Sequence, residues 1–100
     1  MSATVRTSIY IGYESADEVA TVKAFIYKAM QDSEVEGFTI YTGEGVWRGE
    51  PETAIVIEVI GDDPDLDHKI TEVAFRLKDL DGLEQESIYI LREMVDMVVL

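Results

Sequence analysis

The side chains that could support metal binding or catalysis are few in this sequence. Asp63, Asp65 and Asp67 have the spacing of the first three ligands of a calcium-binding loop. Such a loop also needs glycine at its sixth position and glutamate at its twelfth, where this chain has His68 and Ala74. Because acidic residues also stabilise the positive end of a helix, we interpret the three aspartates as a helix start and predict no metal site.

No motif in the chain indicates a catalytic centre. The sequence has no cysteine, which excludes disulfides, zinc–thiolate sites, iron–sulfur clusters and thiol nucleophiles. Its only histidine is His68, in the first turns of a predicted helix. Ser15 is explained by a helix capping box with Glu18, and Ser87 lacks the glycines that surround a serine nucleophile. We therefore predict no catalytic residue and no cofactor.

Residues 43–50, with the sequence GEGVWRGE, form the one segment in which we predict a binding site. Its three glycines would let the backbone approach a ligand closely, and tryptophan beside arginine offers a stacking surface and a fork of donors for an anion. The predicted binding residues are Glu44, Trp47, Arg48 and Glu50. The alternative interpretation is a twisted hairpin whose Trp47 packs in a core or in an oligomer interface.

The charge balance is the most unusual property of the sequence, with 21 acidic residues, eight basic residues and a net charge of −13. Such self-repulsion destabilises a small domain at low salt, and it is screened beyond about 3 Å near 1 M salt. Because the acidic residues are scattered along the chain, we hypothesise a halophilic organism or its virus as the source. The alternative is an acidic mimic of nucleic acid that blocks a DNA-binding protein. Direct nucleic-acid binding is not expected, since phosphates require a basic patch.

Length and composition predict one globular domain over residues 1–100. No segment approaches the run of about 20 apolar residues that a membrane span requires. The first residues, MSATVR, lack the apolar region of a secretory signal. We therefore expect a cytoplasmic protein, in the host cytoplasm if it is viral, without a membrane partner.

The apolar residues predict an alternation of strands and helices. Strands are expected at residues 4–13, 38–42, 53–60, 87–91 and 93–100. Helices are expected from Ser15 to about Gln31, and from about Asp62 to Leu80, while Gly43-Glu44-Gly45 predicts a turn or bulge. The order indicates an α+β, ferredoxin-like βαββαβ sandwich with an extra short C-terminal strand, in which both helices lie on one face of an antiparallel sheet.

This architecture leaves the other face of the sheet without helices. Residues 54–60 are apolar in both phases of the alternation, apart from Glu58, and Tyr10, Tyr41, Tyr89 and Trp47 must also be accommodated. An exposed apolar face is usually covered by a partner. We therefore predict a homo-oligomer, a dimer or a trimer, that forms through the sheet face.

The pattern Trp47-x-Gly49-Glu50 after a strand, followed by the apolar strand 53–60 and a second helix, resembles the CutA and nitrogen-regulatory PII superfamily. That resemblance implies trimers that bind metals, nucleotides or protein partners around the loop between the second and third strands. The chain lacks the lysine-threonine ending of the third strand of CutA, so no metal role is carried over. Gly37-Phe38-Thr39, Trp47-Arg48 and Gln85-Glu86-Ser87-Ile88 also resemble a small uncharacterised bacterial family of the same fold.

Two functional classes follow from these observations. We predict a non-enzymatic, oligomeric binding module of the PII/CutA-like kind, which uses residues 43–52 to contact a protein partner. The second hypothesis is a small enzyme with a pocket between helices and sheet, where Tyr10, Tyr41 or His68 would act as acid or base. A deep pocket lined by these three residues would distinguish the enzyme from the binding module.

Overall fold

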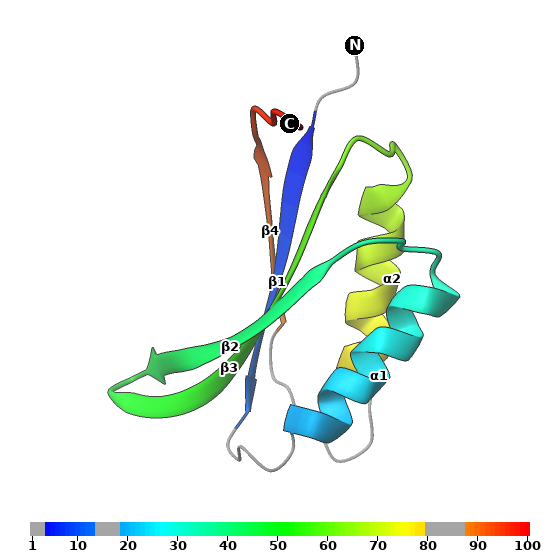
Figure 1. Ribbon diagram of the computed structural model, residues 1–100. Coiled ribbons are helices and arrows are strands. Elements are labelled where there is room, and N and C mark those ends of the chain that lie inside the picture. The colour runs from blue at the N-terminus through cyan, green and yellow to red at the C-terminus, as the bar shows by residue number, and fades with distance from the viewer. Residues whose placement is uncertain (1–3, 14–18, 80–87) are drawn as a thin grey trace.

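The computed structural model describes residues 4–13, 19–79 and 88–100. Its elements in chain order are β1 (Val5–Tyr13), α1 (Val19–Asp32), β2 (Thr39–Trp47), β3 (Glu50–Gly61), α2 (Leu66–Lys78) and β4 (Tyr89–Met94). The strands form one antiparallel sheet in the order β2-β3-β1-β4. Figure 1 shows both helices on the same side of this sheet. The predicted α+β, ferredoxin-like sandwich is therefore confirmed.

The core lies between the helices and the side of the sheet that faces them. Alternate residues of the two central strands point into it, so that Ile9, Ile55 and Ile57 are completely buried. The helices contribute apolar stripes at helical spacing, which include Val22, Ile26, Met30, Ile70, Val73 and Leu77. The second helix, predicted from about Asp62 to Leu80, is thus confirmed from Leu66 to Lys78. Leu80, the last residue of that prediction, lies outside the described residues.

The β2–β3 hairpin turns at Arg48 and Gly49, directly between the paired residues Trp47 and Glu50. Both turn residues have positive φ, 51° and 81°, as a tight two-residue hairpin turn requires. The turn or bulge predicted at residues 43–45 is wrong, because Gly43 and Gly45 stay in register along β2. The prediction took the two glycines as a turn signal, but the backbone at these residues does not have positive φ. The alternative interpretation of residues 43–50 as a hairpin is confirmed for the backbone.

The extra strand predicted at residues 93–100 is also wrong. β4 is a single strand that ends at Met94, and residues 95–100 belong to no strand. The last contact of the ladder is the hydrogen bond that the Val95 N–H donates to the Thr4 carbonyl, with an N–O distance of 3.0 Å. Because β1 begins at Val5, β4 has no neighbouring strand to pair with beyond this point.

The start of α2 is stabilised by Asp63, as the interpretation of the aspartate cluster expected. Asp65 occupies the N-cap position but makes no capping bond with its side chain. The Asp63 carboxylate instead accepts hydrogen bonds from the Asp65 N–H at 2.9 Å and from the Lys69 ammonium at 3.0 Å. The backbone donor first, and Lys69 second, lower the pKa of Asp63. The predicted capping box at Ser15 and Glu18 lies outside the described residues.

Neither helix in the described part of the chain is long and apolar enough to cross a lipid bilayer.

Candidate interaction surface

Three tyrosines and a valine form a continuous row across the sheet face that carries no helix. The strand registers place Tyr41 opposite Val56, Val56 opposite Tyr10, and Tyr10 opposite Tyr89. This tyrosine row (Tyr41, Val56, Tyr10 and Tyr89) therefore crosses all four strands. Tyr10, Tyr41 and Tyr89 are 38%, 46% and 56% exposed, whereas Val56 between two of them is only 6% exposed. The open face thus carries a band of aromatic side chains that are partly exposed to solvent.

A short sequence signal could have revealed this row. The dipeptide Ile-Tyr occurs four times, at residues 9–10, 40–41 and 88–89 in three strand regions and at residues 26–27 in a helix. Because side chains alternate along a strand, an isoleucine directed to the helices places the following tyrosine on the open face. The pairing of these tyrosines across the sheet could not be read from the sequence, since it depends on the strand order and registers.

The open face also carries Arg6 and the carboxylates of Glu93, Glu58 and Glu52, which lie on either side of the tyrosine row. Arg6 donates from Nε and Nη2 to Oε1 of Glu93, at 2.9 and 2.6 Å. This pairing with Glu93 raises the pKa of Arg6. Along the strands, Glu58 lies between Arg6 and the tyrosine row. Glu52 lies on the other side of the row, toward the hairpin turn. Arg6 therefore lies beside two carboxylates at its end of the face.

The Glu52 side chain lies across the neighbouring strand β1. A Cβ atom placed on Gly12 would come within 2.4 Å of Oε1 of Glu52, so the carboxylate occupies the space above the glycine. Glu52 is half-buried there. The carboxylate is therefore held over β1, the strand that also carries Arg6.

The structure places the four predicted binding residues on the projecting end of the hairpin. Arg48 forms the turn, and Trp47 and Glu50 are the strand residues that close it. Glu44 pairs with Thr53, and since residues 50 and 53 alternate, Glu44 and Glu50 point to opposite faces of the hairpin. An open hollow of about 300 Å³ beside them is lined by Gly43, Glu44, Pro51, Glu52 and Thr53. The four predicted residues therefore share one region of the hairpin, with Glu44 and Glu50 on its opposite faces.

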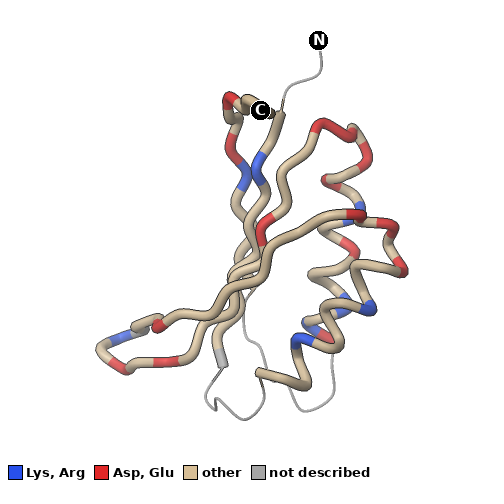
Figure 2. Tube along the Cα trace, viewed as in Figure 1, with Lys and Arg blue, Asp and Glu red and all other residues tan. Residues whose placement is uncertain are grey.

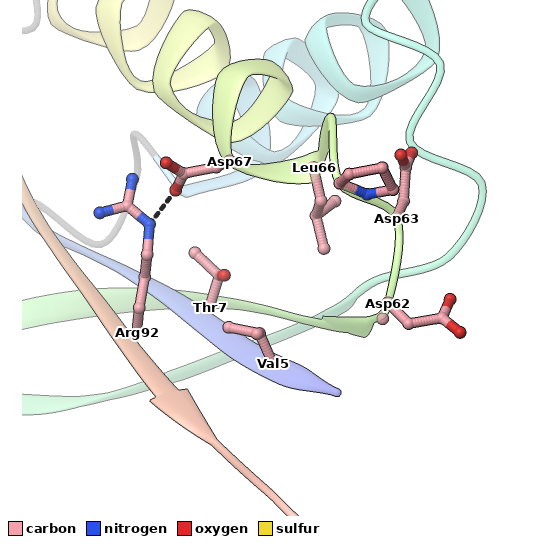
Figure 3. A pocket seen from close by; sticks show the side chains of 9 residues that line it. Val5, Thr7, Asp62, Asp63, Leu66, Asp67 and Arg92 are labelled. Atoms are coloured by element: carbon pink, nitrogen blue, oxygen red, sulfur yellow. Dashed lines mark ion pairs between the residues drawn. The ribbon is translucent and has the colours of Figure 1, made fainter. Parts of the chain in front are cut away.

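A second hollow, of about 420 Å³, lies between the sheet and the start of α2. Val5, Thr7 and Leu66 line it, and an ion pair between Arg92 and Asp67 spans one side (Figure 3). The residues proposed as acid or base in the enzyme hypothesis do not line it. Tyr10 and Tyr41 lie on the opposite face of the sheet, which makes that part of the hypothesis wrong, and His68 is exposed.

The acidic residues do not gather on one face of the described molecule. Figure 2 shows them on the hairpin, in the loop before α2, on both helices and near the end of β4. A nucleic-acid mimic would require its carboxylates in a contiguous array, so this distribution does not favour mimicry. Among the described residues, no group of three or more histidine, aspartate and glutamate side chains could hold a metal ion.

No protein-family model matches the chain, and no curated protein matches it in sequence. Solved structures match in fold. A DUF3240 family protein from Shewanella baltica OS155 has a TM-score of 0.70 and 13% identity, over 100% of this chain and 98% of that one. Arabidopsis thaliana PII, in a structure bound to citrate, has a TM-score of 0.61 and 10% identity, over 90% of this chain and 77% of that one.

An enzyme is also among the similar structures. A phage SAM lyase in its apo state has a TM-score of 0.65 and 17% identity, over 90% of this chain and 79% of the lyase. The PII and DUF3240 structures confirm the ferredoxin-like resemblance that the sequence suggested. At these identities the likeness shows the fold alone, and function has to be argued from the surface.

Proposed function

We propose that the protein is a non-enzymatic interaction module of the PII/CutA-like kind, which assembles into a homo-oligomer through the open face of its sheet. The observation that supports this proposal is the tyrosine row on the side of the sheet that no helix covers. Tyrosines combine a large apolar area with a hydroxyl that tolerates water, which suits a surface that is wet in one state and covered in another. Leu91 and Ile60, 55% and 46% exposed on the same face, extend its apolar area.

The end of the hairpin is the second part of the proposal. Its turn projects beyond the body of the molecule (Figure 1), where a protein partner can reach it without disturbing the sheet face. We assign this contact to Glu44, Trp47, Arg48 and Glu50. Oligomer formation and partner binding would then use separate regions of the same small domain.

The working environment is part of the same proposal. A net charge of −13 on 100 residues favours the cytoplasm of a salt-adapted cell, or of its host if the protein is viral. High salt screens the repulsion between copies, so the assembly should form at molar salt concentrations.

Sedimentation velocity of the full chain in 2–3 M NaCl tests the oligomer directly. Tyr10→Ser removes a central member of the tyrosine row and should raise the dissociation constant by about tenfold or more, as loss of a central interface tyrosine does. Tyr27→Ser is the matched control, because Tyr27 is 57% exposed but lies on α1, on the other side of the sheet. It should leave the dissociation constant unchanged.

A wild-type chain that stays monomeric at every salt and protein concentration would refute the oligomer. Equal effects of the two substitutions would show that the association uses another surface. Thermal unfolding of both variants confirms that each remains folded.

A further inference from the structure

Exposed apolar side chains concentrate on β4 and on the segment that follows it, residues 95–100, which we call the tail. β4 is an edge strand of the sheet (Figure 1), and only Ile90 among its six residues is not exposed. Of the thirteen large hydrophobic residues that are exposed in the described part of the chain, seven lie between Tyr89 and Leu100. A sheet edge with unpaired backbone groups and apolar side chains is a template for pairing with another strand.

The backbone of β4 directs its outer donors and acceptors from even-numbered residues. The Val95 N–H points inward, because it donates to the Thr4 carbonyl of the neighbouring chain segment. Hydrogen-bonding direction alternates along an antiparallel strand, so the N–H and C=O groups of Ile90, Arg92 and Met94 point outward. The same alternation continues into the tail when the tail is extended. A strand added at this edge is therefore bonded through even-numbered residues.

We infer that two copies of the chain pair edge to edge through β4, with these strands antiparallel, and that the tail of each copy continues its β4 by pairing with β4 of the other copy. The two-fold axis is perpendicular to the sheet. The two sheets then join into one, with the helices of both copies on the same side. This interface is separate from the open face and does not depend on the tyrosine row.

The register of the pair follows from the side chains. Odd-numbered residues of β4 lie on the open face in both copies, so residues opposite each other must be both odd or both even. Pairing Met94 with Met94 of the other copy satisfies this condition. It places Arg92 opposite Asp96, and it matches the remaining exposed apolar residues with one another. These apolar pairs are Tyr89 with Val99, Ile90 with Val98, and Leu91 with Met97.

The two neighbouring registers are less favourable. Centring the pair on Glu93 would set two carboxylates directly opposite each other, which is destabilising. Centring it on Val95 would set Asp96 opposite Met94 and would leave Arg92 opposite an apolar residue. Of these three registers, the one centred on Met94 sets an acidic residue opposite a basic one.

Arg92 can accept this additional carboxylate. Its Nε pairs with Asp67, and its Nη2 donates to the Thr71 hydroxyl at 3.4 Å. A guanidinium has five N–H donors, and 42% of the Arg92 side-chain surface is exposed. The net charge of −13 on each copy opposes any association, and molar salt screens this repulsion. The edge pair should therefore be sought at high salt.

Proline substitutions in the tail test the pairing, because the tail belongs to no strand in the single chain. Val98→Pro removes an N–H that the inference directs at Ile90 of the other copy. Val99→Pro is the matched control, since its N–H points away from the other copy, where an edge strand tolerates proline. Both are made in a Tyr10→Ser background, which weakens contacts through the open face.

Sedimentation equilibrium in 3 M NaCl compares the variants. Val98→Pro should raise the dissociation constant by about tenfold or more, because the symmetric dimer loses two ladder hydrogen bonds. Val99→Pro should change it by less than about threefold. Thermal unfolding at low protein concentration verifies that both variants fold.

Spin labels on a chain without cysteine test the register. In the proposed dimer Met97 lies opposite Leu91, so two labels on Met97→Cys are six residues apart along the strands, about 20 Å. Val99 lies opposite Tyr89, so two labels on Val99→Cys are ten residues apart, about 33 Å. Pulsed electron paramagnetic resonance should therefore give a distance about 13 Å longer for Val99→Cys than for Met97→Cys.

Equal dissociation constants for the two proline variants would overturn the inference. A difference between them without the lengthening from Met97→Cys to Val99→Cys would assign the tail to another edge, such as that of β2, and would also overturn it. The open-face oligomer stands in either case if Tyr10→Ser weakens association more than Tyr27→Ser. A chain that is monomeric at every concentration would refute both interfaces.

Discussion

The two faces of the sheet are built from the same strands, yet adjacent residues give them different surfaces. On the helix side, Ile9 pairs with Ile57 and both are completely buried. One residue further along the chain, Tyr10 pairs with Val56 and the tyrosine is 38% exposed. Branched aliphatic side chains suit a permanent, dry core, whereas tyrosine remains soluble while exposed and can be covered later. The difference separates the residues that hold the fold from those available for recognition.

The largest expected effect tests this division with neighbouring residues. Ile57→Ala should lower the free energy of unfolding by about 3–4 kcal/mol, because it leaves a cavity in a core that cannot close over it. Val56→Ala should cost about 1.5 kcal/mol in the monomer, from the loss of two buried carbons. Urea denaturation at low protein concentration gives both values.

The association of the two variants should follow the opposite order. Val56→Ala should weaken self-association, while Ile57→Ala should leave the dissociation constant of the folded protein unchanged. If Ile57→Ala weakened association more than Val56→Ala, the two faces would not have the separate roles assigned to them.

Salt should stabilise both the folded monomer and the oligomer, for different reasons. Raising NaCl from millimolar to molar concentrations screens repulsion within the chain and should raise its Tm, by roughly 4–8 °C for each kcal/mol gained. Measurement at low protein concentration isolates this effect on the monomer. At high protein concentration the Tm should rise further, because association stabilises the folded state. A Tm that fell with salt would contradict the hypothesis of salt adaptation.

A smaller effect is expected at the hairpin turn, which lies outside both face regions. Gly49→Ala should cost about 1–2 kcal/mol, because Gly49 has a φ of 81° that an L-alanine adopts only with strain. Gly43→Ala is the matched control, since a Cβ atom there would meet no atom within 4 Å. Equal losses in urea denaturation for the two variants would argue against the turn geometry.

The smallest effect concerns the start of α2, on the helix-covered side. The pKa of Asp63 is held below its ordinary value of 3.8, so its ionised form stabilises the fold above that pH. This contribution is lost as the pH falls through the lowered, folded-state pKa. Asp63→Asn should therefore reduce the Tm slightly at pH 7.

The reduction should disappear in acid, and thermal melts between pH 7 and about pH 2 follow it. Asp62→Asn, which removes a neighbouring carboxylate without such hydrogen bonds among the described residues, should show no comparable change. A Tm difference for Asp63→Asn that persisted unchanged to the lowest pH would assign its cause to something other than the ionised carboxylate.

The sequence allowed the prediction of those features that depend on neighbouring residues. Alternation around Ile9, the apolar run around Ile57 and helical spacing around Val73 predicted the strands and helices. Long-range pairing was not accessible, because Tyr10 and Tyr89 meet only through a strand order set by the whole fold. The fold also decides where a strand stops for lack of a neighbour, which is why residues 95–100 do not extend β4.

At the candidate site, the sequence indicated which residues lie near one another but not the faces to which they point. The four predicted binding residues, Glu44, Trp47, Arg48 and Glu50, do lie together at the hairpin end. Glu44 and Glu50 were expected to share one site, but they point to opposite faces. The hairpin turn falls at Arg48 because a tight turn needs two consecutive residues with positive φ. Glycine content alone does not identify which pair that will be.

The Glu52 carboxylate above Gly12 limits which sequences can keep this surface. Any side chain at residue 12, even a methyl group, would push that carboxylate away from β1 toward solvent. Substitutions at this glycine would then be tolerated by the core, which lies on the other side of the sheet, yet would alter the surface charge near the hairpin. A mutational scan that reads only folding would miss such a position, whereas a scan that reads self-assembly would detect it.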